Sequence, residues 1–313
     1  MQGLDLCEAF YREHGAPMLE REFPALLPLL AVGLVGSGSE CFGYDDAISR
    51  DHDFEAGFCL FLPGEELVDH RTAFLLERAY DRLPREFMGV RRAPIPPVGG
   101  HRHGVIRIAD FLEEKTGTSD GNLPTAAWLT LPEQALAEAT GGRLFYDGLG
   151  LLTERRRALS YLPEGIRRKK IAGELFLLGQ AGQYNYPRSL ARGDSGAAQL
   201  AVVEFARAAM HLLFLLARRY MPYYKWHFRA LSELGRYAEG AAPLEFLLTS
   251  PNTEEVAARK QKTIATLTSF LYEALRREGL SHYTGEEAEG HAHAVNDGIA
   301  EAELRNLHLL AGV

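Results

Sequence analysis

Residues 30–54 read LAVGLVGSGSECFGYDDAISRDHDF and decide the fold of the N-terminal half. An apolar run ends at Val35 and passes directly into Gly36-Ser37-Gly38-Ser39, which indicates a buried strand or a helix end that leads into a turn. A second apolar run, Phe54–Leu62, ends at a Pro-Gly pair and predicts a strand that begins at or just before Asp51. The stretch therefore places a glycine-rich turn between two apolar elements.

Two aspartates separated by one residue stand at the start of that second run. On a strand, residues i and i+2 point to the same face, so Asp51 and Asp53 would project side by side. Two carboxylates that close repel each other unless a cation lies between them. We therefore predict a site for Mg²⁺ (or Mn²⁺) at this pair. The small residues Gly36, Ser37 and Ser39 would let the backbone approach the phosphates of a nucleotide.

The two motifs together resemble the signature of the nucleotidyltransferase superfamily, which includes DNA polymerase beta and the aminoglycoside nucleotidyltransferases. That signature is a hydrophobic residue, then Gly-Ser or Gly-Gly, a spacer and Asp-x-Asp. It is matched here by Val35-Gly36-Ser37 and Asp51-His52-Asp53. The wider stretch looks like an uncharacterised bacterial branch in which a helical domain follows the catalytic one. Segments 145–147, 183–185 and 222–226 also look like that branch, so the resemblance touches most of residues 30–230.

This resemblance implies an enzyme that moves a nucleoside monophosphate from a nucleoside triphosphate to a hydroxyl acceptor and releases pyrophosphate. Asp51 and Asp53 would be catalytic as the ligands of the metal. Active members usually carry a third carboxylate on a later strand, but the strand predicted over 104–108 carries none. Asp110, just past that strand, and Asp147, at the end of a strand predicted over 143–146, are the alternatives. We assign the catalytic role to Asp147.

The pattern of the sequence changes near residue 150, where the helical spacing of apolar residues replaces strand patterns. We therefore predict an α+β chain. Residues 1–150 would form a small mixed β-sheet of nucleotidyltransferase type with flanking helices, and residues 151–313 an all-helical bundle that closes the cleft. The spacing predicts helices over 5–20, 65–82, 132–139, 163–180, 196–220, 224–237, 242–248, 252–277 and 286–310.

Aromatic and basic residues of the helical half suit a nucleotide and its acceptor, since a cation beside an aromatic ring can hold phosphate and a flat base. Lys225 and Arg229 would lie four residues apart on one helical face. The alternative for Lys225 is an ordinary lysine stem that covers a packed aromatic ring. Nucleotide binding is assigned to Arg50, Tyr223, Lys225 and Arg229. Acceptor binding is assigned to Trp226 and, in a loop-like stretch, to Tyr184, Tyr186 and Arg188.

Composition limits the class of protein. The 313 residues are 46% hydrophobic with a net charge of −8, which permits a sizeable core and argues against an extended nucleic-acid surface. The basic runs 155–157 and 167–170 are interpreted as solvated helix surface, with a phosphate or nucleic-acid patch as the alternative. Three cysteines without CxxC spacing, together with the lack of a signal peptide or an unbroken membrane span, predict a cytoplasmic protein without a membrane partner.

Two other function classes stay open. The chain would be a non-catalytic nucleotide-binding or regulatory member, resembling the antitoxin-type nucleotidyltransferases, if the missing acid is decisive. It would be a helical interaction module if the N-terminal half is scaffold only. His101 and His103 are interpreted as loop residues, with a metal site as the alternative. The nucleotide base, the oligomeric state and the acceptor, whether a small molecule, a protein or an RNA end, are not specified by the sequence.

Overall fold

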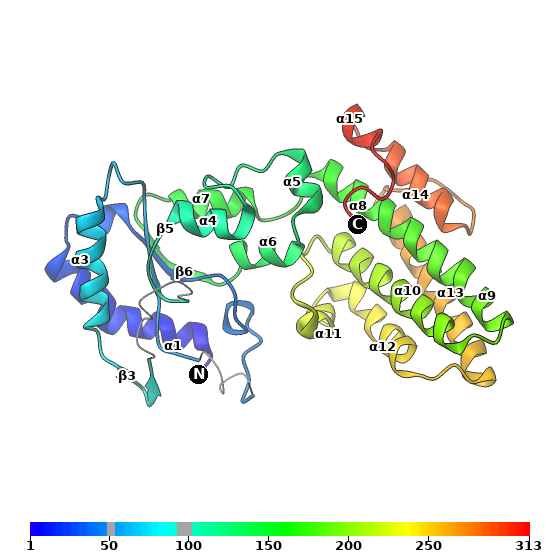
Figure 1. Cartoon of the computed structure of the whole chain (residues 1–313), viewed down its shortest axis with the longest axis horizontal. Helices are drawn as coiled ribbons and strands as arrows, with labels where there is room; N and C mark the ends of the chain where they lie inside the picture. The colour runs from blue at the N-terminus through cyan, green and yellow to red at the C-terminus, as the bar shows by residue number, and fades with distance from the viewer. Residues whose placement is uncertain (49–53, 93–101) are drawn as a thin grey trace. The chain divides into compact units, whose positions relative to one another are not determined.

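The computed structural model describes residues 1–48, 54–92 and 102–313, and these form two compact units (Figure 1). The first unit consists of Met1–Leu123 and Pro132–Ser160, and the second of Pro124–Leu131 and Tyr161–Val313. The first combines a small mixed sheet with helices and the second is helical, so the chain has an α+β fold. The boundary lies near residue 160 rather than at the predicted residue 150. The short segment Pro124–Leu131 precedes this boundary in the sequence but belongs to the second unit.

Long-range hydrogen bonds explain where this boundary falls. Arg156 of α7 (Leu151–Ala158) donates to the carbonyl oxygens of Thr140 and Gly141, each at 2.6 Å, which ties α7 to the first unit. Lys170 of α8 (Glu164–Leu178) donates to the carbonyl oxygen of Leu129 at 3.2 Å. Leu129 lies in α5 (Thr125–Thr130), which therefore belongs to the second unit. The local composition of the sequence cannot reveal such long-range hydrogen bonds.

Four short strands form the sheet of the first unit, in the order β5-β2-β1-β6. The central strand β1 pairs antiparallel with both of its neighbours, and β2 pairs in parallel with β5. Every residue of β1 and β2 is buried, as expected for strands covered on both faces. The bounds are Ala31–Leu34 for β1, Cys59–Leu62 for β2, Gly104–Arg107 for β5 and Arg143–Asp147 for β6. A separate hairpin pairs β3 (Glu86–Phe87) with β4 (Val90–Arg91).

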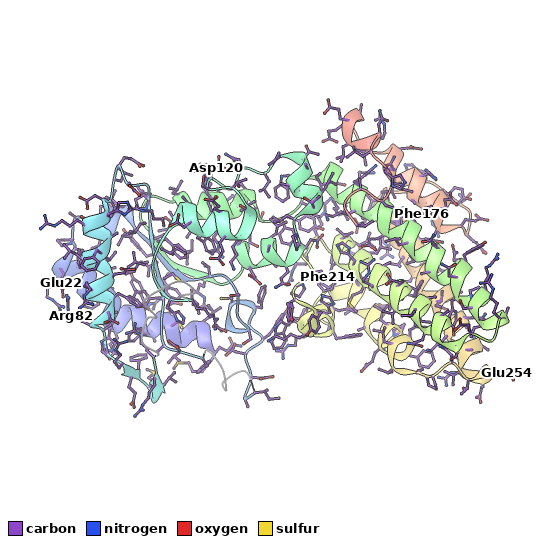
Figure 2. The ribbon with its side chains drawn as sticks, in the orientation of Figure 1. Glu22, Arg82, Asp120, Phe176, Phe214 and Glu254 are labelled. Carbon is purple, nitrogen blue, oxygen red and sulfur yellow. The ribbon has the colours of Figure 1, made fainter. Side chains whose placement is uncertain are left out.

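Helices cover this sheet and share its core. The helix predicted over 5–20 is confirmed as α1 (Gly3–Phe10) and α2 (Ala16–Glu22), joined by a π-helical turn. Phe10 and Leu60 are among the buried side chains of the common core. Figure 2 shows Glu22 beside Arg82, 2.7 Å apart, where the end of α2 meets the end of α3 (His70–Asp81). Two further helices, α4 (Ile108–Thr116) and α6 (Glu133–Thr140), complete the unit with α7.

The strand predicted from near Asp51 to Leu62 is wrong for residues 54–58, because β2 begins at Cys59. Residues 54–58 are not strand, since side chains take up some of their backbone hydrogen bonds. The amide of Phe58 donates to the Tyr80 hydroxyl at 3.1 Å, and the carbonyl oxygen of Glu55 accepts from the Cys7 thiol at 3.3 Å. Asp51 and Asp53 themselves lie outside the described residues.

The second unit is a bundle built around α8, α10 and α13. Two of its predicted helices are interrupted. Residues 224–237 form a 3-10 turn, the short helix α11 and, from the left-handed Gly235, the start of a further 3-10 segment (Gly235–Gly240). Residues 286–310 form α14 and α15. The bounds are Tyr186–Ala191 for α9, Ser195–Leu216 for α10, His227–Leu231 for α11, Ala241–Thr249 for α12, Glu254–Arg277 for α13, Ala288–Asp297 for α14 and Ala302–Arg305 for α15.

The helix α10 is the apolar centre of this bundle. Among the described residues it alone is long and apolar enough to cross a membrane, with a mean hydropathy of 1.5. However, 72% of that stretch is buried inside the protein, as in the core helix of a soluble domain. Figure 2 shows Phe214 of α10 among packed side chains, and Phe214 is 1% exposed. The apolar run therefore serves packing.

Three of the four basic residues of the run 167–170 on α8 are buried, contrary to the interpretation of a solvated surface. Arg167 and Lys169 have no exposed surface and Lys170 is 5% exposed. The Lys169 ammonium donates to the side-chain oxygen of Asn296 at 2.9 Å and to the carbonyl oxygens of Arg305 and Leu307 at 3.3 and 2.7 Å. Lys169 and Lys170 therefore bind carbonyl groups of the C-terminal segment, whereas Arg167 binds the carbonyl oxygen of Leu215 and the carboxylate of Glu278.

Replacement of Lys169 tests this role. Lys169→Met removes a charged donor and leaves three buried oxygens without it, so we expect a loss of about 2–4 kcal/mol in the free energy of unfolding. Urea denaturation followed by helical circular dichroism measures the loss. The matched control is Lys262→Met, an exposed lysine of the same unit, which should cost less than about 0.5 kcal/mol. Equal losses in the two variants would show that Lys169 stabilises nothing specific.

Candidate functional site

The glycine-rich turn leaves the sheet directly after the central strand β1. Gly36 and Gly38 have φ angles of 109° and 122°, a backbone conformation that residues with a side chain rarely adopt. Ser39 then begins a short 3-10 turn, where its carbonyl oxygen accepts the amide of Tyr44 at 2.8 Å. The two glycines of the Gly-Ser-Gly-Ser motif are thus required by the path of the backbone.

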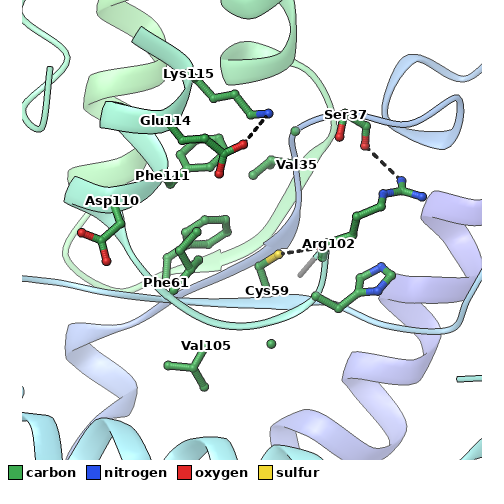
Figure 3. A pocket seen from close by; sticks show the side chains of 14 residues that line it. Val35, Ser37, Cys59, Phe61, Arg102, Val105, Asp110, Phe111, Glu114 and Lys115 are labelled. Atoms are coloured by element: carbon green, nitrogen blue, oxygen red, sulfur yellow. Dashed lines mark hydrogen bonds and ion pairs between the residues drawn. The ribbon is translucent and has the colours of Figure 1, made fainter. Parts of the chain in front are cut away.

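A cavity of about 500 Å³ opens beside this turn (Figure 3). Its wall combines Gly36 and Ser37 of the turn with Phe61 of β2 and Lys115 of α4. Figure 3 shows Arg102 extending from the start of β5 toward Ser37. The cavity has the size of a small-ligand site and presents both apolar and cationic groups.

Arg102 brings a positive charge onto the turn itself. Its guanidinium donates to the carbonyl oxygen of Ser37 at 3.0 Å and forms an ion pair with the buried carboxylate of Glu40. A Cβ atom added to Gly38 would lie only 1.9 Å from the guanidinium nitrogen Nη2. The absence of a side chain at Gly38 therefore lets the charge lie against the turn.

His103 follows Arg102 and also lines the cavity, so the interpretation of His103 as a solvated loop residue is wrong. Its side chain is 11% exposed. Burial, with smaller contributions from the charges of Arg102 and Arg92, lowers the pKa of His103 to about 3. Within the described residues its Nε2 atom is buried without a hydrogen-bond partner. His103 is thus a neutral imidazole in the cavity wall, with its Nε2 atom enclosed by the protein.

The helix α4 forms another wall, and the sequence analysis did not predict it. Phe111 packs edge-on against Phe61, with ring centroids 5.3 Å apart. Asp110 and Lys115 line the cavity on the same helix. Partial burial lowers the pKa of Lys115, but its hydrogen bonds to Glu138 and Glu114 outweigh that effect and raise it overall. The cavity therefore has a second cation and a carboxylate, Asp110, that the sequence analysis left as an alternative.

The register of the sheet argues against Asp147 as the third catalytic carboxylate. Asp147 pairs with Ala31, the first residue of β1, whereas the glycine-rich turn follows the last residue. Five residues of extended chain separate Ala31 from Gly36, which is roughly 16 Å. The Asp147 carboxylate instead accepts hydrogen bonds from the amide and hydroxyl of Thr153, at 2.8 and 2.7 Å. It stabilises the first turn of α7.

Three predicted site residues, Arg50, Asp51 and Asp53, lie outside the described residues, as does His101. The neighbouring acids have other roles. Asp46 accepts the amide of Ile48 at 2.9 Å, a contact typical of a turn aspartate. Asp45 accepts the amide of Gly3 at 2.8 Å and anchors the start of α1. No cluster of three potential metal ligands is found in residues 1–48, 54–92 and 102–313.

The residues assigned to the acceptor belong to the helical unit and are not in a loop. Tyr184 lies in a π-helical segment (Gly179–Asn185), and Tyr186 and Arg188 lie in α9. The Arg188 guanidinium covers the Tyr184 ring at 4.6 Å, and Tyr184 is 55% exposed. Tyr186 is fully buried and donates its hydroxyl to Asn252 at 3.2 Å. Tyr186 is therefore a packing residue, while Tyr184 and Arg188 form an accessible pair.

The segment that carries Lys225 is also part of the helical unit. The Lys225 ammonium lies 5.1 Å from the centre of the Trp226 ring, and the rings of Tyr223 and Tyr224 stand 4.3 Å apart. Arg229 lies in the next helix, 3.9 Å from Glu233. Lys225 and Arg229 thus do not share one continuous α-helix.

The three cysteines are free and buried near the turn. Burial raises the pKa of the Cys7 and Cys59 thiols to about 12 in each case. Protonated thiols are poor nucleophiles and poor metal ligands. They contribute apolar packing to the site rather than chemistry.

Because His103 is buried and neutral, the free energy of unfolding should depend on pH. Because its folded pKa lies below the unfolded value of about 6.5, the unfolded chain binds the proton more tightly, and stability falls as the pH drops below that value. Between pH 7 and 5 wild type should lose about 2 kcal/mol more than His103→Gln. Urea denaturation at both pH values measures this difference. His70→Gln, an exposed histidine at 79%, should follow wild type; identical curves for all three proteins would refute the burial argument.

The comparisons with known proteins concern a different part of the chain. Residues 128–227 match a family described as a domain of unknown function, DUF4037. The match covers less than half of the chain, runs from α5 to the start of α11, and includes Tyr184, Lys225 and Trp226 but not the turn at Gly36. No curated protein matches the chain.

Proposed function

We propose that the chain is a metal-dependent nucleotidyltransferase. It would bind a nucleoside triphosphate at the turn of the first unit and transfer the nucleoside monophosphate to a hydroxyl acceptor. The acceptor is a small molecule, a protein or an RNA end. The proposal places the protein in the reducing cytoplasm, where its buried thiols stay free.

One observation carries the proposal: a buried central strand ends in a turn of left-handed glycines beside a cavity with two cations. The turn lets the backbone at Gly36 approach a polyphosphate, since Gly36 carries no side chain. Arg102, which is paired with Glu40, and Lys115, which is paired with Glu138 and Glu114, line the same cavity with charged donors. His103 adds a neutral imidazole to the lining of the same cavity.

The reaction requires the protein mainly to position the acceptor and the triphosphate and to stabilise the negative charge that develops. The acceptor oxygen forms a bond to the α-phosphorus, the bond to the pyrophosphate oxygen breaks, and the acceptor proton passes to a carboxylate. Negative charge then grows on the pyrophosphate, where Arg102 would stabilise it. Asp110 is the described carboxylate of the cavity that suits the role of base.

The implied metal is Mg²⁺ or Mn²⁺, with Asp51 and Asp53 as its ligands. Their carboxylate oxygens form the hard donor set that these ions prefer. Phe54 follows Asp53 in the sequence, and Glu40 follows the glycine-rich turn. A Cβ atom added to Gly3 would lie 3.3 Å from the ring of Phe54 and 2.7 Å from the Cβ atom of Glu40, so both residues are neighbours of Gly3. When bound, the ion would supply neutralisation of phosphate charge.

A specific observation favours a second candidate, a non-catalytic nucleotide-binding or regulatory protein of the same fold. Strand β5 carries no carboxylate, and Asp147 stands at the far end of β1. Without a third acid a bound nucleotide would persist unreacted. Binding and turnover must therefore be measured separately.

Pyrophosphate release tests the enzyme. Wild type with labelled nucleoside triphosphates, Mg²⁺ and a panel of hydroxyl acceptors should release pyrophosphate, and Asp53→Ala should lose about a hundredfold or more of the rate because a metal ligand is gone. The matched control is Asp46→Ala, an exposed turn aspartate, which should keep the rate. Release that survives in Asp53→Ala contradicts the mechanism. Saturable triphosphate binding without release supports the non-catalytic candidate.

The role of Arg102 is tested by affinity. Arg102→Gln removes the charge beside the turn and should weaken triphosphate binding about tenfold to a hundredfold by isothermal titration calorimetry. Arg107→Gln is the control, because Arg107 at the other end of β5 donates to the carbonyl oxygens of Pro63 and Val68 at 2.9 and 3.0 Å. That variant should lower stability and leave affinity unchanged. Equal affinities for wild type and Arg102→Gln would remove Arg102 from the site.

A further inference from the structure

A second cavity lies in the helical unit, where α12 and α13 face each other. Its volume is about 640 Å³, which suits a small organic ligand. Six positions of α13 line it at spacings of one, three or four residues, and so form a single helical face: 259, 262, 263, 266, 267 and 270. The opposite wall includes Pro243 and Phe246 of α12.

The body of this cavity is apolar. Leu267 forms a buried part of the wall at 3% exposure. The rings of Phe246 and Phe270 are half-buried, one on each helix. Partly exposed aromatic rings on two facing helices offer contact area for a flat apolar group.

The rim of the cavity is cationic. The Arg259 guanidinium lies over the Phe246 ring, 5.0 Å from its centre, which forms a flat positively charged surface. Lys262 stands one turn further along α13 and is exposed. Neither cation pairs with a carboxylate in the described part of the chain. The single acid of the lining is Glu239.

Lys260 lies between these two cations in the sequence, but it is buried and hydrogen-bonded rather than directed to the cavity. It is fully buried, and its ammonium donates to the carbonyl oxygen of Ser250 at 2.6 Å and to the side chains of Gln199 and Asn252 at 2.9 and 3.1 Å. Lys260 thus stabilises the fold, whereas Arg259 and Lys262 face the cavity. In a chain of net charge −8, two unpaired cations beside an apolar cavity point to an anionic ligand.

We infer that this cavity binds a small organic anion with an aromatic body. The ring system packs against Phe246 and Phe270, and the anionic group lies between Arg259 and Lys262. All these residues belong to the helical unit and none is assigned to the nucleotide site. The inference is therefore independent of the proposed transferase activity.

The probe is 8-anilinonaphthalene-1-sulfonate, an aromatic sulfonate whose fluorescence rises in apolar sites. It should bind the full chain saturably at one site, and the double variant Arg259→Gln/Lys262→Gln should bind it about tenfold more weakly, because both charges are gone. Thr266→Trp, which fills the cavity, should abolish binding. Circular dichroism and thermal unfolding establish that each variant is folded.

The control is Arg276→Gln/Arg277→Gln, which removes two exposed charges in the last turn of the same helix and should leave affinity unchanged. The neutral N-phenyl-1-naphthylamine should bind more weakly than the sulfonate. Equal affinity for the two probes, or equal affinity of wild type, Arg259→Gln/Lys262→Gln and Thr266→Trp for the sulfonate, would overturn the inference.

Discussion

The burial of one short strand between two backbone partners determines the geometry of the first unit. All four residues of β1 are buried, and both edges of the strand are hydrogen-bonded. Gly33 permits this, because a Cβ atom there would lie 2.5 Å from the carbonyl oxygen of Arg143 in β6. A central strand cannot shift without breaking two ladders, so the point where the chain leaves the sheet is rigid. The turn at Gly36, the guanidinium of Arg102 and the wall of α4 are all positioned relative to that point.

Local patterns predicted the elements of this unit better than they predicted its site. An apolar run followed by Gly-Ser-Gly-Ser carries its own physical signal, and the structure has a strand and a turn of left-handed glycines there. Asp147 had an equally clear local signal at a strand end, but the antiparallel register puts it at the wrong end of β1. Register is a long-range property that local spacing does not contain. His103 was misjudged for the same reason, since its burial depends on segments distant in the sequence.

Charge patterns were misleading in the helical unit because charge alone does not distinguish a solvated lysine from one that is buried and hydrogen-bonded. Arg167, Lys169 and Lys170 resemble a surface run, yet their nitrogens bind oxygens of α5, α10, α13 and the C-terminal segment. A lysine can be buried when backbone carbonyls replace its water. The unit thus combines an apolar core around α10 with polar hydrogen bonds that join segments distant in the sequence. Similar chemistry at Lys260 holds α13 to the residues before it.

The contact of Lys170 with the carbonyl oxygen of Gly312, at 2.9 Å, has a consequence for how the chain is made. Gly312 is synthesised 142 residues after Lys170. If the Lys170 ammonium became buried before then, it would lose water without gaining this carbonyl oxygen as an acceptor. The contact between Lys170 and Gly312 therefore forms only after residue 312 has emerged from the ribosome, whereas every segment of the first unit is available once residue 160 has emerged. Synthesis thus makes the whole sheet unit available before the helical unit can form this contact.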